Sequence, residues 1–204
     1  MDPALEVEAD PGHDRILTIP NVITVVRLCL LPVFLWLLFG KEDRATAAWL
    51  LAALGTTDFF DGYIARHFNQ VSDIGKILDP VADRLLFFIG VGGIAVDGSV
   101  PSWFAIAVLV REALVAGATL TLAGLGVRRI DVTWFGKAYT LLLMIAFPLF
   151  LASHSTLGWH EGGRTAAWIF GVPGLVLAWY SAALYVPMAR RALRERDHST
   201  EVPT

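Results

Sequence analysis

Residues 58–86 read DFFDGYIARHFNQVSDIGKILDPVADRLL, and the positions of four aspartates in this stretch constrain the rest of the chain. Asp58 and Asp61 are three residues apart, and Asp79 and Asp83 are four apart, so each pair falls on one face of a helix. Apolar sequence long enough to cross a bilayer surrounds both pairs. Because a carboxylate inside a membrane is costly, its presence there indicates a function. Four acids that can converge predict a cation site.

The composition places the chain among membrane proteins. Of its 204 residues, 55% are apolar and 17% are charged, and the mean hydropathy is +0.59. A soluble domain of this length does not need so much apolar sequence. The net charge of −3 argues against a nucleic-acid partner. The single cysteine, Cys29, lies in an apolar run and is interpreted as a small apolar residue of a helix.

Apolar runs of about 20 residues predict an all-α integral membrane bundle of six transmembrane helices. We expect a flexible polar N-terminus over residues 1–15, one membrane domain over residues 16–190 and a polar cytoplasmic tail over residues 191–204. Residues 16–20 are expected to form a short interfacial segment. The six spans are predicted at residues 21–39, 44–68, 74–96, 101–123, 135–153 and 165–188.

The distribution of Lys and Arg predicts the orientation in the cell membrane. Six spans place both termini on one side. With that side in the cytoplasm, the inner segments hold Arg15, Arg66, Lys76, Arg128, Arg129, Lys137, Arg190, Arg191, Arg194 and Arg196. The outer segments then hold only Lys41, Arg44 and Arg164. Since positive residues favour the cytoplasmic side, both termini and the aspartates are predicted there.

The second and third spans are joined by a short connection, so their polar ends meet and bring the four carboxylates together. Carboxylate oxygens suit Mg²⁺, Mn²⁺ or Ca²⁺, and the absence of His and Cys from the cluster disfavours zinc. Arg66 continues the same helical face and could pair with a phosphate. One or two divalent ions beside an arginine predict a pyrophosphate site able to support phosphoryl transfer.

Three further cations lie within or beside the apolar runs, and each has two interpretations. Arg27 either extends to the membrane interface or contacts a phosphate. Arg111, next to Glu112, forms either a structural ion pair inside the bundle or a substrate contact. Lys137 is either an interfacial anchor or a phosphate ligand.

The aspartate stretch resembles the signature of the CDP-alcohol phosphatidyltransferase family at all eight motif positions and without a gap. The lead-in with Asn21, Thr24 and Arg27 is similar to the first helix of that family. The matching pattern is Asp58-x2-Asp61-Gly62-x2-Ala65-Arg66-x8-Gly75-x3-Asp79-x3-Asp83.

The resemblance implies an enzyme of phospholipid biosynthesis that displaces CMP from a CDP-linked lipid, CDP-diacylglycerol, with an alcohol as nucleophile. It implies two Mg²⁺ or Mn²⁺ ions held by Asp58, Asp61, Asp79 and Asp83, and a CDP site formed by Asp58, Gly62, Ala65, Arg66 and Gly75. Asp83 would also be the catalytic base that takes the proton of the acceptor hydroxyl. A homodimer is a further expectation from the family.

The acceptor is predicted from residues outside the signature. Lys137, Arg111 and Arg27 are the candidate acceptor ligands. Residues 136–140 read GKAYT, whereas phosphatidylglycerophosphate synthases tend to have a second lysine, as in GKLKT. The stretch therefore resembles the CMP-forming cardiolipin synthases, whose acceptor is phosphatidylglycerol. The alternatives are glycerol 3-phosphate as acceptor and, from a different class, an ion or proton transporter.

Overall fold

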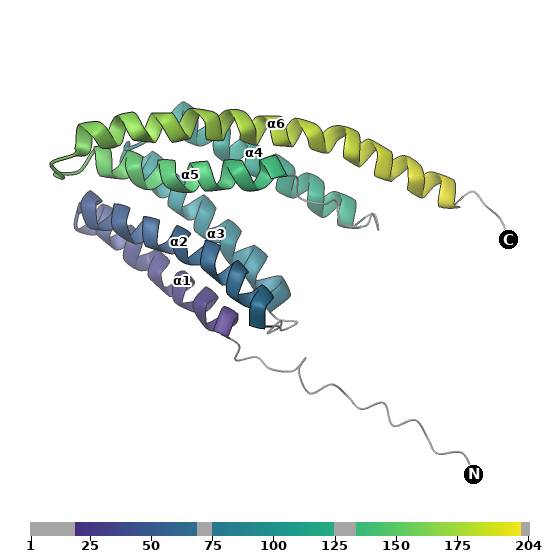
Figure 1. The fold of residues 1–204 in the computed structure, drawn as a ribbon, viewed down its shortest axis with the longest axis horizontal. Helices are drawn as coiled ribbons and strands as arrows, with labels where there is room; N and C mark the ends of the chain where they lie inside the picture. Colours follow the sequence, from purple (N-terminus) through teal and green to yellow (C-terminus); the bar gives the residue numbers. More distant parts are fainter. Residues whose placement is uncertain (1–18, 69–74, 125–133, 201–204) are drawn as a thin grey trace, which may run out of the picture.

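The computed structural model describes residues 19–68, 75–124 and 134–200, and all regular secondary structure in these ranges is helical, as predicted (Figure 1). A π-helical turn, η1, extends the first helix. The elements in chain order are α1 (Ile19–Leu35), η1 (Trp36–Gly40), α2 (Arg44–Phe68), α3 (Gly75–Asp97), α4 (Ser102–Gly124), α5 (Trp134–Ser153) and α6 (His160–Thr200).

Helices occur where the six spans were predicted, with two differences at the ends of the chain. Ile19 and Pro20, expected in an interfacial segment, already belong to α1, and residues 16–18 lie outside the described ranges. At the other end α6 continues to Thr200, through most of the expected tail. Within the described residues, four stretches are long and apolar enough to span a membrane: Val22–Gly40, Ser102–Leu122, Trp134–Ser153 and His160–Pro187.

The helices form a bundle in which neighbours in sequence run in alternating directions. The α5–α6 pair has the most extensive contact, and α5 also packs against α2. At the other side α1 packs against both α2 and α3. As Figure 1 shows, the start of α1 and the end of α6 lie at the same end of the bundle. The end of α2 and the start of α3, which carry the aspartate stretch, lie there too.

An ion pair fixes the opposite end of α2 and α3. Nε and Nη2 of Arg44 each donate a hydrogen bond of 2.9 Å to a carboxylate oxygen of Asp97. Asp97 also accepts a hydrogen bond from the hydroxyl of Ser99. Because Arg44 begins α2 and Asp97 ends α3, the two helices are antiparallel, as predicted.

The turn before α2 supplies the helix with its N-terminal cap. Glu42 has a φ of 54°, which reverses the chain after η1. Oδ1 of Asp43 then accepts a 3.0 Å hydrogen bond from the backbone NH of Thr46, the usual role of a carboxylate before a helix. The Thr46 hydroxyl donates to the same carboxylate at 2.6 Å. These hydrogen bonds, led by that of the hydroxyl, lower the pKa of Asp43.

The core of the bundle is aromatic and aliphatic. Phe104 on α4 lies within ring contact of Phe147 and Phe150 on α5 and of Trp168 on α6. Such contacts add about 0.5–1.5 kcal/mol per pair beyond the burial of area. Elsewhere many large apolar side chains point outward, which fits a bundle whose surroundings are lipid.

Candidate active site

An arginine and an aspartate from different helices meet near the end of the bundle that carries the aspartate stretch. Nη1 of Arg27 on α1 lies 3.5 Å from Oδ1 of Asp83 on α3. The arginine is only 4% exposed, whereas the side chain of Asp83 is 48% exposed. Arg27 is therefore inside the bundle, and the interpretation that it extends to the membrane interface is wrong.

The pair lines a cavity of about 370 Å³, which we call the Arg27–Asp83 pocket. Residues of α1, α2, α3, α4 and α5 form its walls. Its polar lining consists of Arg27, Asp83, Arg84, Glu112, Tyr139 and Thr140. Its remaining lining is apolar apart from the backbone at glycines, and consists of Leu31, Phe34, Leu51, Leu54, Gly55, Leu86, Phe87, Gly90, Val91, Ile94, Met144, Phe147 and Pro148.

The two kinds of lining make the pocket amphipathic. Charged residues beside a larger apolar wall suit a ligand that has both a polar headgroup and an acyl chain. A small hydrophilic substrate needs only the charged residues. Asp83 faces this space and is accessible, so its carboxylate can reach a hydroxyl group bound there.

Arg111 on α4 is held by three other groups of the protein. Its Nε donates a 3.0 Å hydrogen bond to the carbonyl of Ala178 on α6, and its Nη1 donates to Glu112 at 2.8 Å. Nη1 also donates to the hydroxyl of Tyr139 on α5, and the guanidinium lies 4.0 Å from the centroid of that ring. With 2% of its surface exposed and no part in the pocket lining, Arg111 forms an ion pair with Glu112 and links α4, α5 and α6.

Lys137 lies in the first turn of α5 and is exposed. Gly136, just before it, is buried, and the carbonyl of Gly136 accepts a 3.0 Å hydrogen bond from the hydroxyl of Thr140. Thr140 lines the pocket, and the exposed Lys137 lies three residues before it on α5 without being part of the lining.

Most residues of the signature lie on the described helices α2 and α3, but their side chains are outside the described part of the structure. Asp58, Asp61, Gly62, Ala65 and Arg66 belong to α2, and Gly75 and Asp79 belong to α3, as predicted from their spacing. Among the described side chains, no group of three or more His, Cys, Asp or Glu residues could hold a metal. Asp83 is the one signature aspartate in that set, so the predicted metal and CDP ligands remain predictions.

The structure adds two residues that the sequence reasoning missed. Arg84 follows Asp83 and lines the same pocket. Tyr139 was noted only as a missing lysine, yet it contacts Arg111 and forms part of the pocket wall. A tyrosine hydroxyl in an apolar helix needs a partner, and this requirement was the available signal.

Comparison with known proteins gives the family. Residues 17–185 match the CDP-alcohol phosphatidyltransferase family. The chain is 37% identical over 199 residues to a cardiolipin synthase (CMP-forming) of Streptomyces coelicolor, covering 94% of this chain and 92% of that protein. It is 32% identical to a putative cardiolipin synthase of Mycobacterium tuberculosis, covering 90% and 88%.

A third relative has a different name. The chain is 33% identical over 147 residues to a CDP-diacylglycerol–glycerol-3-phosphate 3-phosphatidyltransferase of Bacillus subtilis, covering 65% of this chain and 76% of that protein. The family match spans most of the chain and includes both the aspartate stretch and the helices around the Arg27–Asp83 pocket. The protein therefore belongs to the CDP-alcohol phosphatidyltransferase family and is a phosphatidyltransferase.

Proposed function

We propose that this protein transfers the phosphatidyl group of CDP-diacylglycerol to phosphatidylglycerol, forming cardiolipin and releasing CMP. The observation that carries the choice of acceptor is the similarity to cardiolipin synthase along 94% of the chain. The amphipathic Arg27–Asp83 pocket supports it, because a lipid acceptor brings both a polar headgroup and acyl chains.

The donor would bind at the aspartate stretch. In this proposal the small residues allow the CDP group to approach the helices closely, and Arg66 pairs with its diphosphate. The antiparallel arrangement of α2 and α3, fixed at their far ends by Arg44 and Asp97, supports a shared site at their other ends. The residues assigned to CDP are Asp58, Gly62, Ala65, Arg66 and Gly75.

The same site would hold two Mg²⁺ or Mn²⁺ ions. Their ligands would be the carboxylates of Asp58, Asp61, Asp79 and Asp83, a donor set of hard oxygens that fits these ions. When bound, the ions supply positive charge that neutralises the diphosphate and the departing CMP. The signature spacing on two antiparallel helices supports this assignment.

Asp83 would act as the general base. Its accessible carboxylate takes the proton from a glycerol hydroxyl of the acceptor, and the hydroxyl oxygen attacks the phosphorus of the phosphatidyl group. A new phosphorus–oxygen bond forms while the bond to the CMP phosphate breaks, and CMP leaves with the electron pair. Arg27, 3.5 Å from Asp83, orients the carboxylate and supplies a positive charge close to the reacting phosphate.

Lys137 and Arg27 would bind the phosphodiester of the acceptor, while Arg111 acts indirectly by holding Tyr139 in the pocket wall. Lys137 and Arg27 can pair with the single negative charge of phosphatidylglycerol. Arg111, which forms an internal ion pair with Glu112, is not in the pocket lining.

The protein would cross the cell membrane six times, with both termini and the active site on the cytoplasmic side. The alternating helices, with α1 starting and α6 ending at one end of the bundle, support an even number of crossings (Figure 1). The excess of Lys and Arg in the segments at that end supports its cytoplasmic location. We further propose that the enzyme is a homodimer, as expected for its family.

A test of acceptor use is direct. Purified protein receives CDP-diacylglycerol and Mg²⁺ or Mn²⁺, and CMP release is measured with phosphatidylglycerol, glycerol 3-phosphate and inositol phosphate offered separately. We expect release with phosphatidylglycerol alone. Release only with glycerol 3-phosphate would support the second candidate, which the Bacillus subtilis relative favours. If folded protein releases no CMP with any of these acceptors, the proposed transfer from CDP-diacylglycerol is excluded.

A further inference from the structure

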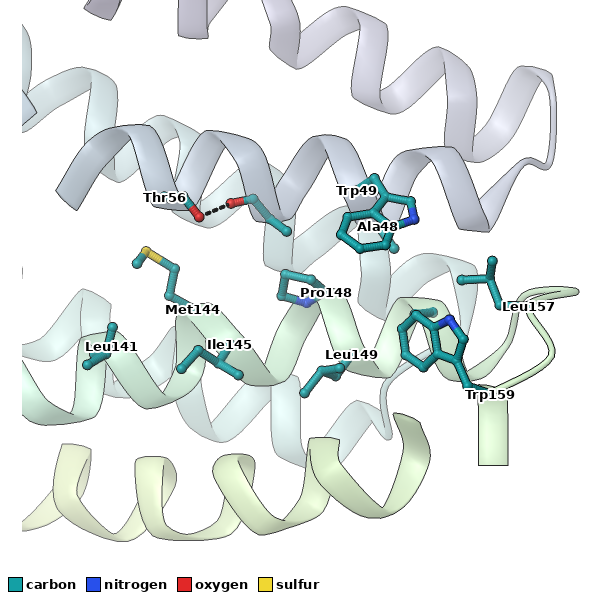
Figure 2. A pocket seen from close by; sticks show the side chains of 12 residues that line it. Ala48, Trp49, Thr56, Leu141, Met144, Ile145, Pro148, Leu149, Leu157 and Trp159 are labelled. Carbon is teal, nitrogen blue, oxygen red and sulfur yellow. Dashed lines mark hydrogen bonds between the residues drawn. The ribbon is translucent and has the colours of Figure 1, made fainter. Parts of the chain in front are cut away.

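A second cavity lies on the outside of the bundle between α2 and α5, and we call it the α2/α5 groove. It has a volume of about 340 Å³. Figure 2 shows the side chains of Ala48, Trp49 and Thr56 on α2 facing those of Leu141, Met144, Ile145, Pro148 and Leu149 on α5. Trp49, Leu157 and Trp159 close one end, and Thr56 and Leu141 lie at the other (Figure 2).

The lining of the α2/α5 groove is almost entirely apolar. None of its lining residues is charged. Its one hydroxyl, on Thr56, already donates a 2.7 Å hydrogen bond to the carbonyl of Ala52 on the preceding turn of α2 (Figure 2). A hydrocarbon chain can therefore fill the groove without leaving a charge or this hydroxyl unpaired.

Only a thin partition separates the groove from the Arg27–Asp83 pocket. Met144 and Pro148 line both cavities. Met144 rests on Gly55, where an added Cβ atom would come within 2.5 Å of the Met144 Cγ. The glycine thus makes room for a flexible side chain at the boundary, and movement of that side chain would join the two cavities.

Lys137 precedes the two residues of this partition on α5. Met144 and Pro148 follow Lys137 by seven and eleven residues, so the three fall on one line along α5. Lys137 is exposed and lies about 6 Å before Leu141, the first groove residue of α5, at a rise of about 1.5 Å per residue. A positive charge at the top of an apolar groove suits an anionic lipid.

The length of the groove fits one acyl chain. From Leu141 to Ala152 it follows α5 for about 16 Å at the helical rise, close to half of a hydrocarbon core of about 30 Å. At the end away from Lys137 the groove is closed by Trp49 and Trp159.

We propose that the α2/α5 groove holds an acyl chain of the acceptor lipid, phosphatidylglycerol, with its phosphate at Lys137. The inference rests on the proposed function and adds to it the binding site of the acceptor's hydrocarbon. The groove lies between α2 and α5, and the acceptor is assigned here because α5 carries the proposed acceptor ligand Lys137. The start of that helix carries Lys137, and Thr140 one turn on lines the Arg27–Asp83 pocket.

Filling the groove provides the test. Ala52→Phe places a ring in its floor. The control is Ala53→Phe, because Ala53 is the next residue of the same helix, is exposed and lines neither cavity. For Ala52→Phe we expect the KM for long-chain phosphatidylglycerol to rise about three- to tenfold, since packing against lipid tails gives modest energies. The KM for CDP-diacylglycerol and the activity with dihexanoyl phosphatidylglycerol should stay close to wild type.

A measurement independent of turnover accompanies the kinetics. Phosphatidylglycerol with a diazirine in its acyl chain should label peptides covering residues 48–56 and 141–152 of the full-length protein, and Ala52→Phe should lose this labelling while Ala53→Phe keeps it. Retained turnover of the short-chain acceptor shows that the variant is folded. A variant inactive with both acceptors is judged by the labelling, provided that it elutes as folded protein in detergent.

Several outcomes would overturn the inference. A raised KM for long-chain CDP-diacylglycerol alone would assign the groove to the donor. A change in oligomeric state with unchanged KM values would make it a contact between two copies. If Ala52→Phe has the same KM values and the same labelling as wild type, no acyl chain binds in the groove, and the phosphatidyltransferase function is unaffected by that result. A wild-type protein that transfers to glycerol 3-phosphate and not to phosphatidylglycerol would instead refute the proposed function itself.

Discussion

Asp83 lines the Arg27–Asp83 pocket with an accessible side chain, as a general base for a bound hydroxyl must. We expect Asp83→Asn to lower kcat by about a hundredfold or more, because an amide cannot take the proton of the acceptor hydroxyl. CMP release under saturating lipid measures the effect. The control is Asp43→Asn at the start of α2, where asparagine is an equally good cap and turnover should persist. Activity of Asp83→Asn close to wild type would refute the role of the carboxylate.

Arg111 is expected to contribute to stability and not to acceptor affinity. Its guanidinium is 2% exposed and has partners on α4, α5 and α6. Arg111→Met leaves Glu112 and the carbonyl of Ala178 without this donor, so we expect a loss of about 2–4 kcal/mol in the free energy of unfolding. Thermal unfolding in detergent measures the loss.

The KM for phosphatidylglycerol distinguishes the two roles of Arg111. In Arg111→Met protein kept below its unfolding temperature, this KM should lie close to the wild-type value. Tyr139→Phe, which removes only one hydroxyl from the cluster, should show the same pattern with a smaller loss of about 1 kcal/mol. A stable Arg111 variant with a strongly raised acceptor KM would contradict this assignment.

At the scale of the helices, the contact between α2 and α5 depends on one glycine. A Cβ atom at residue 55 would collide with Met144, so Gly55→Ala should cost about 1–3 kcal/mol of packing energy against a gain in helix propensity of about 1 kcal/mol. We expect Gly55→Ala to lower activity and Gly55→Ala combined with Met144→Ala to restore part of it. An effect of the double variant equal to the sum of the effects of Gly55→Ala and Met144→Ala alone would show that the two residues are not coupled.

The ion pair between the ends of α2 and α3 is a second link between elements. Asp97 is almost fully buried, while Arg44 is about one third exposed, so solvent weakens their attraction. We expect Asp97→Ala to lower the free energy of unfolding by about 1–2 kcal/mol, including the loss of the hydrogen bond from Ser99. Thermal melts compare it with Glu42→Gln in the adjacent turn, which should unfold as wild type does. A matching effect of both changes would indicate a nonspecific charge effect.

Periodicity and spacing predicted the helices well, and contacts between them poorly. Apolar runs located all six helices because burial of apolar surface in lipid depends on local sequence. The π-helical turn at Trp36–Gly40 and the continuation of α6 to Thr200 were missed, since neither is specified by hydropathy alone. The partner of Arg27 lies 56 residues away in Asp83, and no local pattern reveals such a pair.

The site shows the same division. The aspartate spacing placed the signature residues on two helices, and their roles are what the family resemblance implies. Tyr139 was read as a missing charge, although its structural role depends on Arg111, which is 28 residues away in sequence and meets it only through helix packing. Side-chain partners across helices require the tertiary structure, whereas residues on one helical face do not.

At the scale of the whole molecule, orientation in the membrane is open to a direct test. In a Cys29→Ser background, Glu42→Cys in the turn before α2 should react from outside the cell with a membrane-impermeant maleimide. Ser199→Cys near the end of α6 should react only after permeabilisation, because ten Lys and Arg residues favour that side against three. The reverse pattern would place the active site on the outer face and contradict the proposed topology.

The most direct measurement of the central claim follows the acyl chains of both lipids into the product. Purified protein is given unlabelled CDP-diacylglycerol, phosphatidylglycerol with deuterated chains, and Mg²⁺ or Mn²⁺, and the products are analysed by mass spectrometry. We expect cardiolipin with one unlabelled and one deuterated pair of chains, and one CMP for each molecule formed. Cardiolipin with only deuterated chains, or CMP release without cardiolipin, would contradict transfer from CDP-diacylglycerol to phosphatidylglycerol.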